Sequence, residues 1–126
     1  MRVVDTSAWV EWVSNTPLRD TVATLLPPRN EWLVPSIVRL ELLKWLLRVA
    51  RPDLTEWVMG LTEQCIIVPL DFNLADEAAL AWDTHKLATA DAVIYATARA
   101  HNAELLTCDR HFEGLPGVIY VPKSAQ

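Results

Sequence analysis

The sequence predicts an α/β fold in which a parallel sheet of about five strands carries helices on both faces. Three observations lead to this prediction: a length of 126 residues that suits one domain, a hydrophobic fraction of 52%, and a regular alternation of short apolar segments with helical ones. We expect residues 1–126 to fold as one unit, because the sequence contains no internal repeat or flexible linker. A ligand site in such a fold is expected outside the carboxyl ends of the strands.

Five segments have the apolar, often β-branched composition of short buried strands. They are residues 2–4, 32–34, 65–70, 104–107 and 118–121. The segments with helical periodicity are residues 6–13, 17–26, 36–50, 52–64, 74–83 and 89–101. Thr6 and Ser7 are placed to cap the first helix. Thr16 before Pro17 favours the start of the second helix, and Thr89 is expected to cap the last.

Charge, cysteine content and glycine content exclude several classes of protein. Eleven Lys and Arg against sixteen Asp and Glu give a net charge of −5, so any contact with nucleic acid requires a local basic patch or a metal. Cys65 and Cys108 fit neither a disulfide framework nor a Cys-x-x-Cys site, which favours a reducing cytoplasm. We expect neither a signal peptide nor a membrane span, because the apolar runs are too short. The three glycines form no phosphate-binding loop.

Four carboxylates stand where a site at the carboxyl ends of the strands would form. Asp5 follows the first strand, Asp109 follows the fourth, Asp91 lies in the first turn of the last helix, and Glu41 lies within the long third helix. Each alone has an ordinary interpretation, as a turn former, a helix-end charge or part of a solvated face. The helix after Asp91 has so few charges that we expect it to be buried, with Asp91 against the sheet.

Together the four carboxylates indicate a metal site. Two like charges about 4 Å apart repel by roughly 4 kcal/mol at an effective dielectric constant near 20, so a carboxylate cluster requires a cation or bound protons. Oxygen ligands with no adjacent thiolate or imidazole favour Mg²⁺ or Mn²⁺ over zinc. Such an ion activates water and stabilises charge on a displaced oxygen, which predicts hydrolysis of phosphodiester bonds.

The third helix carries a stripe of cations beside Glu41. Taking Arg39 as zero and about 100° per residue, Glu41, Lys44, Arg48 and Arg51 fall at about 200°, 140°, 180° and 120°. One interpretation is a solvated face with a weak Glu41 to Lys44 pair. The other places Glu41 in the acidic pocket, with the three cations as a basic rim that binds the phosphates of a bound strand.

These motifs resemble the PIN-domain nucleases, and more narrowly the VapC-type toxins of bacterial and archaeal toxin–antitoxin pairs. The resemblance begins at Val3-Val4-Asp5-Thr6-Ser7-Ala8 and continues at Ile37-Val38-Arg39-Leu40-Glu41-Leu42-Leu43. It is most specific over Leu87-Ala88-Thr89-Ala90-Asp91-Ala92 and closes with Leu106-Thr107-Cys108-Asp109-Arg110-His111-Phe112. Where family members often have glycine after the helix of Asp91, this chain has His101-Asn102-Ala103, and asparagine also adopts the left-handed conformation that ends a helix.

The resemblance implies a three-layer α/β/α sandwich in which Asp5, Glu41, Asp91 and Asp109 ligate Mg²⁺ or Mn²⁺. It implies that the hydroxyls of Thr6 and Thr107 support the acidic residues. The implied activity is that of an endoribonuclease directed at single-stranded RNA, inhibited by a cognate VapB-type antitoxin.

The remaining distinctive residues have structural interpretations. His85, His101 and His111 share no metal-ligand spacing, and we interpret them as surface or helix-end residues. Tryptophans on apolar helical stretches are expected to pack in the core, although some favour an interface with a second copy or an antitoxin. We therefore expect a homodimer, and we rank base stacking by these rings lower because nothing places them beside the acidic residues.

Two other functions remain open from the sequence. An aspartyl-phosphate phosphatase or receiver-like protein also has an Asp after its first strand, but such a phosphatase requires a second Asp where Ser7 stands. A catalytically silent interaction module would use the same fold and its tryptophans alone.

Overall fold

A computed structural model describes residues 1–123 of the protein. Five parallel strands form one sheet, as predicted, and their order is β3-β2-β1-β4-β5. The strands are β1 (Arg2–Val4), β2 (Trp32–Pro35), β3 (Ile66–Val68), β4 (Glu104–Thr107) and β5 (Val118–Tyr120). The single domain predicted over residues 1–126 stays a prediction, and its last three residues lie outside the described ones.

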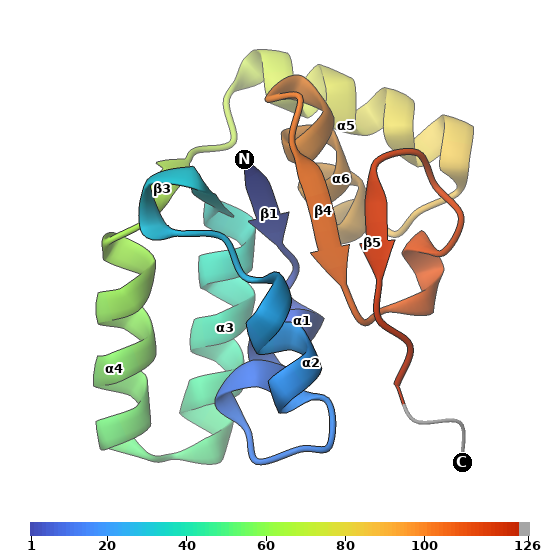
Figure 1. The fold of residues 1–126 in the computed structure, drawn as a ribbon. Coiled ribbons are helices and arrows are strands. Elements are labelled where there is room, and N and C mark those ends of the chain that lie inside the picture. The colour runs from blue at the N-terminus through green and yellow to red at the C-terminus, as the bar shows by residue number, and fades with distance from the viewer. Residues whose placement is uncertain (124–126) are drawn as a thin grey trace.

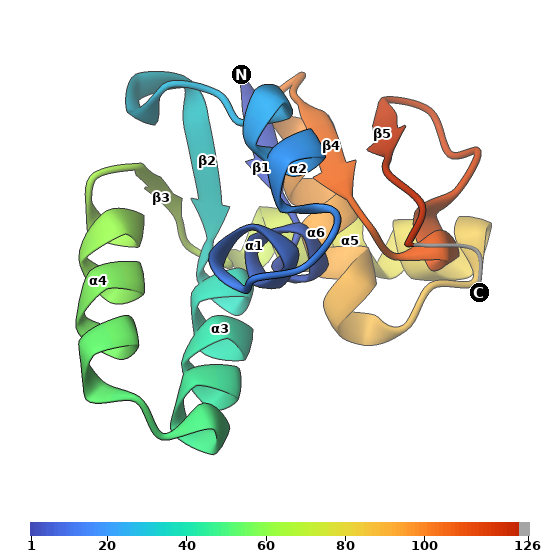
Figure 2. The same cartoon turned by 60° about the horizontal axis from the view of Figure 1, so that its bottom comes forward.

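Helices cover both faces of the sheet, which makes the three-layer α/β/α sandwich (Figure 1). They are α1 (Thr6–Val13), α2 (Arg19–Leu25), α3 (Ser36–Val49), α4 (Pro52–Glu63), α5 (Phe72–His85) and α6 (Thr89–Ala100), with 3₁₀ helices η1 (Arg29–Glu31) and η2 (Arg110–Phe112). Helices α1 and α2 lie on one face and α5 and α6 on the other, while α3 and α4 extend as an antiparallel pair beyond the tip of β2 (Figure 2). Among the helices of residues 1–123, none has both the length and the apolar character needed to cross a membrane.

The strand order places β1 at the centre and defines where a ligand site forms. From β1 the chain adds β2 and β3 on one side, then crosses to add β4 and β5 on the other. The order therefore reverses between β1 and β4, and ligands of open α/β sheets bind at such a reversal. Val4 pairs with Leu106, so the residues that follow β1 and β4 leave the sheet side by side.

Apolar residues of the strands and of the helices packed on them form the core. Val3, Val4 and Leu33 are almost completely buried in the sheet. Residues 92–98 of α6 are all buried, as their lack of charge predicted. Asn102, two residues after the end of α6, has the expected left-handed conformation, with φ of 54°. Burying α6 holds its first turn, and with it Asp91, against the end of the sheet.

The predicted caps of the first two helices are wrong. Thr6 and Ser7 lie inside α1, and their hydroxyls bond to carboxylates rather than to the helix backbone. The hydroxyl of Thr16 donates to the carbonyl of Glu11 at 3.1 Å, and Leu18 occupies the cap position of α2 without a side-chain bond. Helix α2 accordingly begins at Arg19, two residues later than predicted.

Two further helix starts differ from prediction. Thr89 is the first residue of α6, and Ala88 occupies the cap position without a side-chain bond. Helix α5 begins at Phe72 because the Asp71 carboxylate accepts the N–H of Leu74 at 2.9 Å and so caps the helix. The pattern predicted this start only at residue 74.

Both cysteines are free thiols. Cys108 is buried, while Cys65 lies just before β3 and is only partly buried. Burial raises the pKa of each thiol to about 11, so both stay protonated at neutral pH.

Candidate metal and RNA site

The adjacent strands β1 and β4 bring two carboxylates together from opposite ends of the chain. Asp5 follows β1 directly and is 3% exposed. Its N–H donates to the carbonyl of Leu106 at 2.8 Å, which continues the pairing of the two strands by one residue. Asp109 lies two residues beyond the end of β4 and is half-buried. The position of both carboxylates therefore follows from the sheet itself.

Helices α3 and α6 add the other two predicted carboxylates. Asp91 lies in the first turn of α6, and Glu41 lies in the second turn of α3. The four acids line one pocket of about 250 Å³, together with Thr6, Ser7, Lys44, Trp45 and Arg48. Segments that are far apart in the sequence thus converge on one acidic pocket, called here the carboxylate pocket.

Two hydroxyls fix the buried carboxylate of Asp5. Its Oδ2 accepts hydrogen bonds from Ser7 Oγ at 2.7 Å and from Thr107 Oγ1 at 2.8 Å. The same hydroxyls accept from the backbone: the N–H of Cys108 donates to Ser7 at 3.0 Å, and that of Asp109 donates to Thr107 at 2.9 Å. The loop after β4 is therefore tied to Asp5 through side chains, and the role predicted for Thr107 in supporting a metal site stays a prediction.

Glu41 has a support of its own. Thr6 Oγ1 donates to Glu41 Oε1 at 2.6 Å, which links the first turn of α1 to α3. Thr6 is thus the second predicted hydroxyl found against a carboxylate of the pocket. A hydrogen bond from a neutral hydroxyl orients the carboxylate without neutralising its charge.

Burial and mutual repulsion raise the carboxylate pKa values in this pocket. Burial raises the pKa of Asp5, the bonds from Ser7 and Thr107 lower it, and the charges of Glu41 and Asp109 raise it further. For Asp91, burial is again the largest cause, followed by the charges of Asp5, Asp109 and Glu41, and the pKa rises to about 6. The pocket therefore disfavours its own full ionisation.

The donor set of the pocket fits a hard divalent cation. Carboxylate oxygens are the ligands that Mg²⁺ and Mn²⁺ prefer, and the buried Asp5 carboxylate has only neutral hydroxyls as side-chain hydrogen-bond partners among the described residues. A cation among these groups offsets the repulsion that raises the pKa values of Asp5 and Asp91. Asp5, Glu41, Asp91 and Asp109 are the residues that would hold it.

The predicted basic rim is only partly at the pocket. Lys44 and Arg48 line it. Helix α3 ends at Val49, and Ala50 adopts a left-handed conformation with φ of 58°, so the helical angles do not extend to Arg51. Arg51 instead precedes α4 and forms an ion pair with Asp53 at 2.9 Å.

Sequence reasoning missed three residues of this site. Ser7 was interpreted as a cap, yet its hydroxyl binds Asp5, two residues before it. Trp45 lines the pocket, although no feature of the sequence was found to place a tryptophan beside the acids. His111, interpreted as a surface residue, has its Nδ1 atom 3.1 Å from Asp109 Oδ1. The missed signal was proximity in sequence, since Trp45 lies one turn after Glu41 and His111 two residues after Asp109.

Comparisons with known proteins give one family and a set of similar folds. The sequence model of the PIN domain matches residues 2–118, whereas comparison with curated protein sequences gave no match. A toxin–antitoxin complex from Klebsiella pneumoniae has a TM-score of 0.82 and 22% identity, covering 94% of this chain and 96% of that one. VapC20 of Mycobacterium tuberculosis, a toxin that cleaves the sarcin–ricin loop, has a TM-score of 0.77 and 17% identity, covering 98% and 100%. FitAcB from Neisseria gonorrhoeae has a TM-score of 0.74 and 23% identity, covering 97% and 98%.

Proposed function

Since the chain belongs to the PIN-domain family, we propose that it is a divalent-metal-dependent endoribonuclease that hydrolyses phosphodiester bonds in single-stranded regions of RNA. We also propose that it is the toxin of a VapBC-type pair, inhibited by a VapB-type antitoxin in the cytoplasm, because similar folds occur in toxin–antitoxin complexes. The observation that carries the nuclease proposal is the convergence of four carboxylates on a pocket that two cations also line.

In the proposed reaction, the chain's own residues bind and orient the reactants. Asp5, Glu41, Asp91 and Asp109 hold Mg²⁺ or Mn²⁺, and Ser7 with Thr107 keeps Asp5 in one orientation. When bound, such an ion supplies a Lewis acid that lowers the pKa of a water and offsets charge on the leaving oxygen.

The RNA strand is proposed to lie across α3 beside the carboxylates. Lys44 and Arg48 bind its phosphates, which brings a polyanion to a protein with a net charge of −5. Trp45 lines the same pocket between these two cations in the sequence, and an unpaired base stacks on an indole ring without sequence preference. This arrangement favours single strands, whose unpaired bases can turn outward and stack on an aromatic ring.

The first test is digestion of a labelled single-stranded RNA with Mg²⁺, with Mn²⁺ and with a chelator. We expect cleavage by the wild type with either metal and none with the chelator. Asp5→Asn removes a central carboxylate and is expected to abolish cleavage, whereas Asp76→Asn, on the exposed face of α5, leaves it unchanged. Equal cleavage by Asp5→Asn and the wild type would refute the assignment of Asp5 to the catalytic site.

Two results would favour the other functions left open by the sequence. A wild type that binds a partner protein but cleaves no RNA with any divalent metal is an interaction module. A transient acylphosphate on Asp5 would indicate a phosphatase or a receiver-like protein.

The second test measures how RNA affinity depends on salt concentration. The double variant Lys44→Ala with Arg48→Ala loses two phosphate contacts, so the slope of log affinity against log salt should fall by about 1.4. The matched control is Arg19→Ala with Arg29→Ala, exposed cations on α2 and η1, and it should keep the wild-type slope. An unchanged slope in the first variant would mean that Lys44 and Arg48 do not bind RNA and belong to a solvated helix face.

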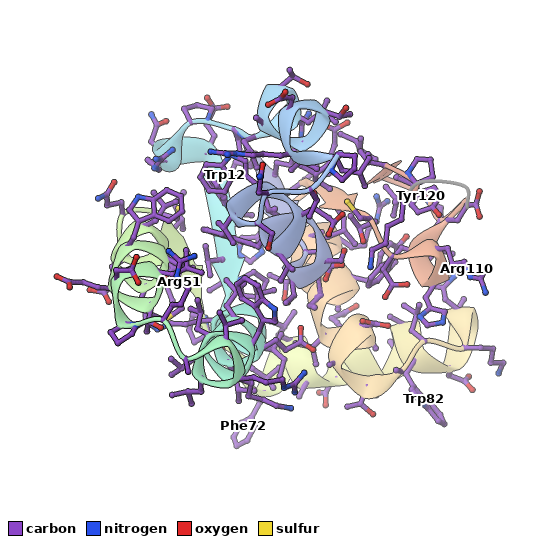
Figure 3. All side chains as sticks on the ribbon, turned by 90° about the horizontal axis from the view of Figure 1, so that it is seen from below. Trp12, Arg51, Phe72, Trp82, Arg110 and Tyr120 are labelled. Atoms are coloured by element: carbon purple, nitrogen blue, oxygen red, sulfur yellow. The ribbon has the colours of Figure 1, made fainter. Side chains whose placement is uncertain are left out.

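We also propose a homodimer in which a second copy covers the outer face of α5. Phe72, Leu80 and Trp82 are 92%, 63% and 53% exposed there, and Phe72 and Trp82 project from the same side of the molecule (Figure 3). Trp82 also lines an apolar cavity of about 320 Å³ between α5 and α6. Exposed apolar surface of this kind is typical of protein interfaces.

A further inference from the structure

The turn after β4 holds a histidine at the edge of the carboxylate pocket. Asp109 begins the 3₁₀ helix η2, where its Oδ1 accepts the N–H of His111 at 2.9 Å. Phe112, the next residue, is fully buried and anchors the turn in the core. The backbone of His111 is therefore fixed from both sides, although its side chain is 73% exposed.

The imidazole of His111 faces two of the four carboxylates. Its Nδ1 atom lies 3.1 Å from Asp109 Oδ1 and 3.9 Å from Asp91 Oδ2. One donor atom from each of the three side chains lies within 4.8 Å of the other two. Two oxygens and one nitrogen are thus gathered on the α6 and η2 side of the pocket, where the sequence predicted oxygen ligands alone.

The other two histidines are held by contacts elsewhere. His85 packs edge-on against the ring of Tyr95, with 5.2 Å between the ring centroids. His101 Nδ1 lies 2.9 Å from the carbonyl of Thr97 at the end of α6. Among the three histidines, His111 alone has a ring nitrogen beside carboxylates of the pocket in the described part of the chain.

We propose that His111 is a nitrogen ligand of the bound cation and that it makes the site select Mn²⁺ over Mg²⁺. This inference rests on the proposed metal-dependent function. Both ions prefer oxygen donors, but Mg²⁺ binds almost only oxygen and gives up its waters reluctantly, whereas Mn²⁺ is a first-row transition ion that also accepts a nitrogen ligand. Replacing one oxygen or water ligand by Nδ1 therefore costs Mg²⁺ more than it costs Mn²⁺. The carboxylates supply the negative charge that any divalent ion requires, and His111 makes the site discriminate between Mn²⁺ and Mg²⁺.

The decisive experiment observes the ligand directly, with Mn²⁺ as the probe. Full-length protein is freed of metal with a chelator, loaded with one equivalent of Mn²⁺ and examined by pulsed electron paramagnetic resonance. We expect a hyperfine coupling from a directly bound nitrogen in the wild type. The coupling should disappear in His111→Asn and persist in His101→Asn, a matched substitution at an exposed histidine outside the pocket. Absence of nitrogen coupling in the wild type overturns the inference, whether or not the variants fold.

Calorimetric titration with Mn²⁺ and with Mg²⁺ tests the selection. Asn places an oxygen near the position of Nδ1, so His111→Asn should retain Mg²⁺ binding. Its preference for Mn²⁺ over Mg²⁺ should fall about tenfold, which is the lower end of the loss in metal affinity seen when groups around a metal are changed. An unchanged ratio of the two affinities means that His111 only positions Asp109, and this too overturns the inference. Nitrogen coupling without RNA cleavage would refute the proposed nuclease activity and leave the assignment of His111 as a ligand intact. RNA cleavage without nitrogen coupling would refute the ligand assignment and leave the proposed nuclease activity intact.

Discussion

Helix α1 contributes to two regions of opposite character, a polar pocket and an apolar cluster. Its first turn supplies Thr6 and Ser7 to the carboxylate pocket, and its next turns supply Trp9 and Trp12 to a cluster of aromatic rings, called here the tryptophan cluster. The cluster consists of Trp9, Trp12, Trp32 and Trp57. In one region carboxylates lie close together and partly buried, which raises the pKa of Asp91, and in the other large apolar rings are packed at centroid distances of 4.7 to 6.0 Å.

The difference shows how so small a domain tolerates a polar site at the end of its central strand. Trp9 and Trp32 are fully buried, and each ring removes a large apolar area from water. The pocket gives up stability in the absence of a cation, because Asp5 and Asp91 have raised pKa values. Residues of one short helix therefore contribute both to a stabilising core and to a site that the core must hold in place.

The largest expected effect comes from the tryptophan cluster. Trp9→Ala removes a fully buried ring that contacts Trp32 at 4.7 Å, and it should lower the free energy of unfolding by about 4 kcal/mol. Trp57→Ala, at the half-exposed end of the cluster, should cost about 1 kcal/mol. Denaturant unfolding at pH 7 measures both. Equal losses at the two positions would mean that burial does not determine the contribution of these rings.

The next effect has the opposite sign and lies in the carboxylate pocket. The pKa of Asp91 is raised from 3.8 to about 6 by burial and by three neighbouring carboxylates. Removing its charge by Asp91→Asn should raise the free energy of unfolding of the metal-free protein by about 2 kcal/mol above pH 7. Asp76→Asn on α5 should change it by less than about 0.5 kcal/mol. A metal-free Asp91→Asn protein less stable than the wild type would contradict the raised pKa.

The same pKa shift predicts how the stability of the metal-free wild type changes with pH. An unfolded Asp91 releases its proton near pH 3.8 and the native one near pH 6, so between these values the native state binds more protons. The contribution of Asp91 to the free energy of unfolding therefore falls as pH rises from about 4 to about 6 and is level above that. Thermal unfolding in chelator across this range should show a steeper fall for the wild type than for Asp91→Asn. Identical profiles would mean that Asp91 titrates normally.

The sequence predicted the fold and the four acids because both depend on local patterns. Short apolar segments locate the strands, and the parallel sheet then brings Asp5 and Asp109 to the same edge. The supporting bonds could not be predicted in this way. Ser7 reaches Asp5 instead of capping α1, and Thr107 reaches it only because β1 and β4 are neighbours. That pairing is a property of the whole sheet.

Errors of one or two residues at helix ends explain the other differences. The helical angles placed Arg51 with Lys44 and Arg48, but the left-handed turn at Ala50 ends α3 first. The sequence patterns predicted no helix or strand around His111, although the Asp109 carboxylate caps a 3₁₀ turn there and so directs the imidazole toward the pocket. In both places a single capping interaction decides which side chains reach the site.

The smallest expected effect on stability is at the exposed apolar residues on the outside of α5, in contrast to the tryptophan cluster. Phe72 is 92% exposed, so Phe72→Ser should change the free energy of unfolding of the monomer by less than about 0.5 kcal/mol. The same substitution should weaken self-association, because it removes the most exposed ring from the face that a second copy is proposed to cover. Sedimentation velocity over a range of protein concentrations measures this, with Trp57→Ser on α4 as the control that keeps wild-type association. If Phe72→Ser associates like the wild type, the second copy binds elsewhere or does not bind, and the exposed rings of α5 then require another partner.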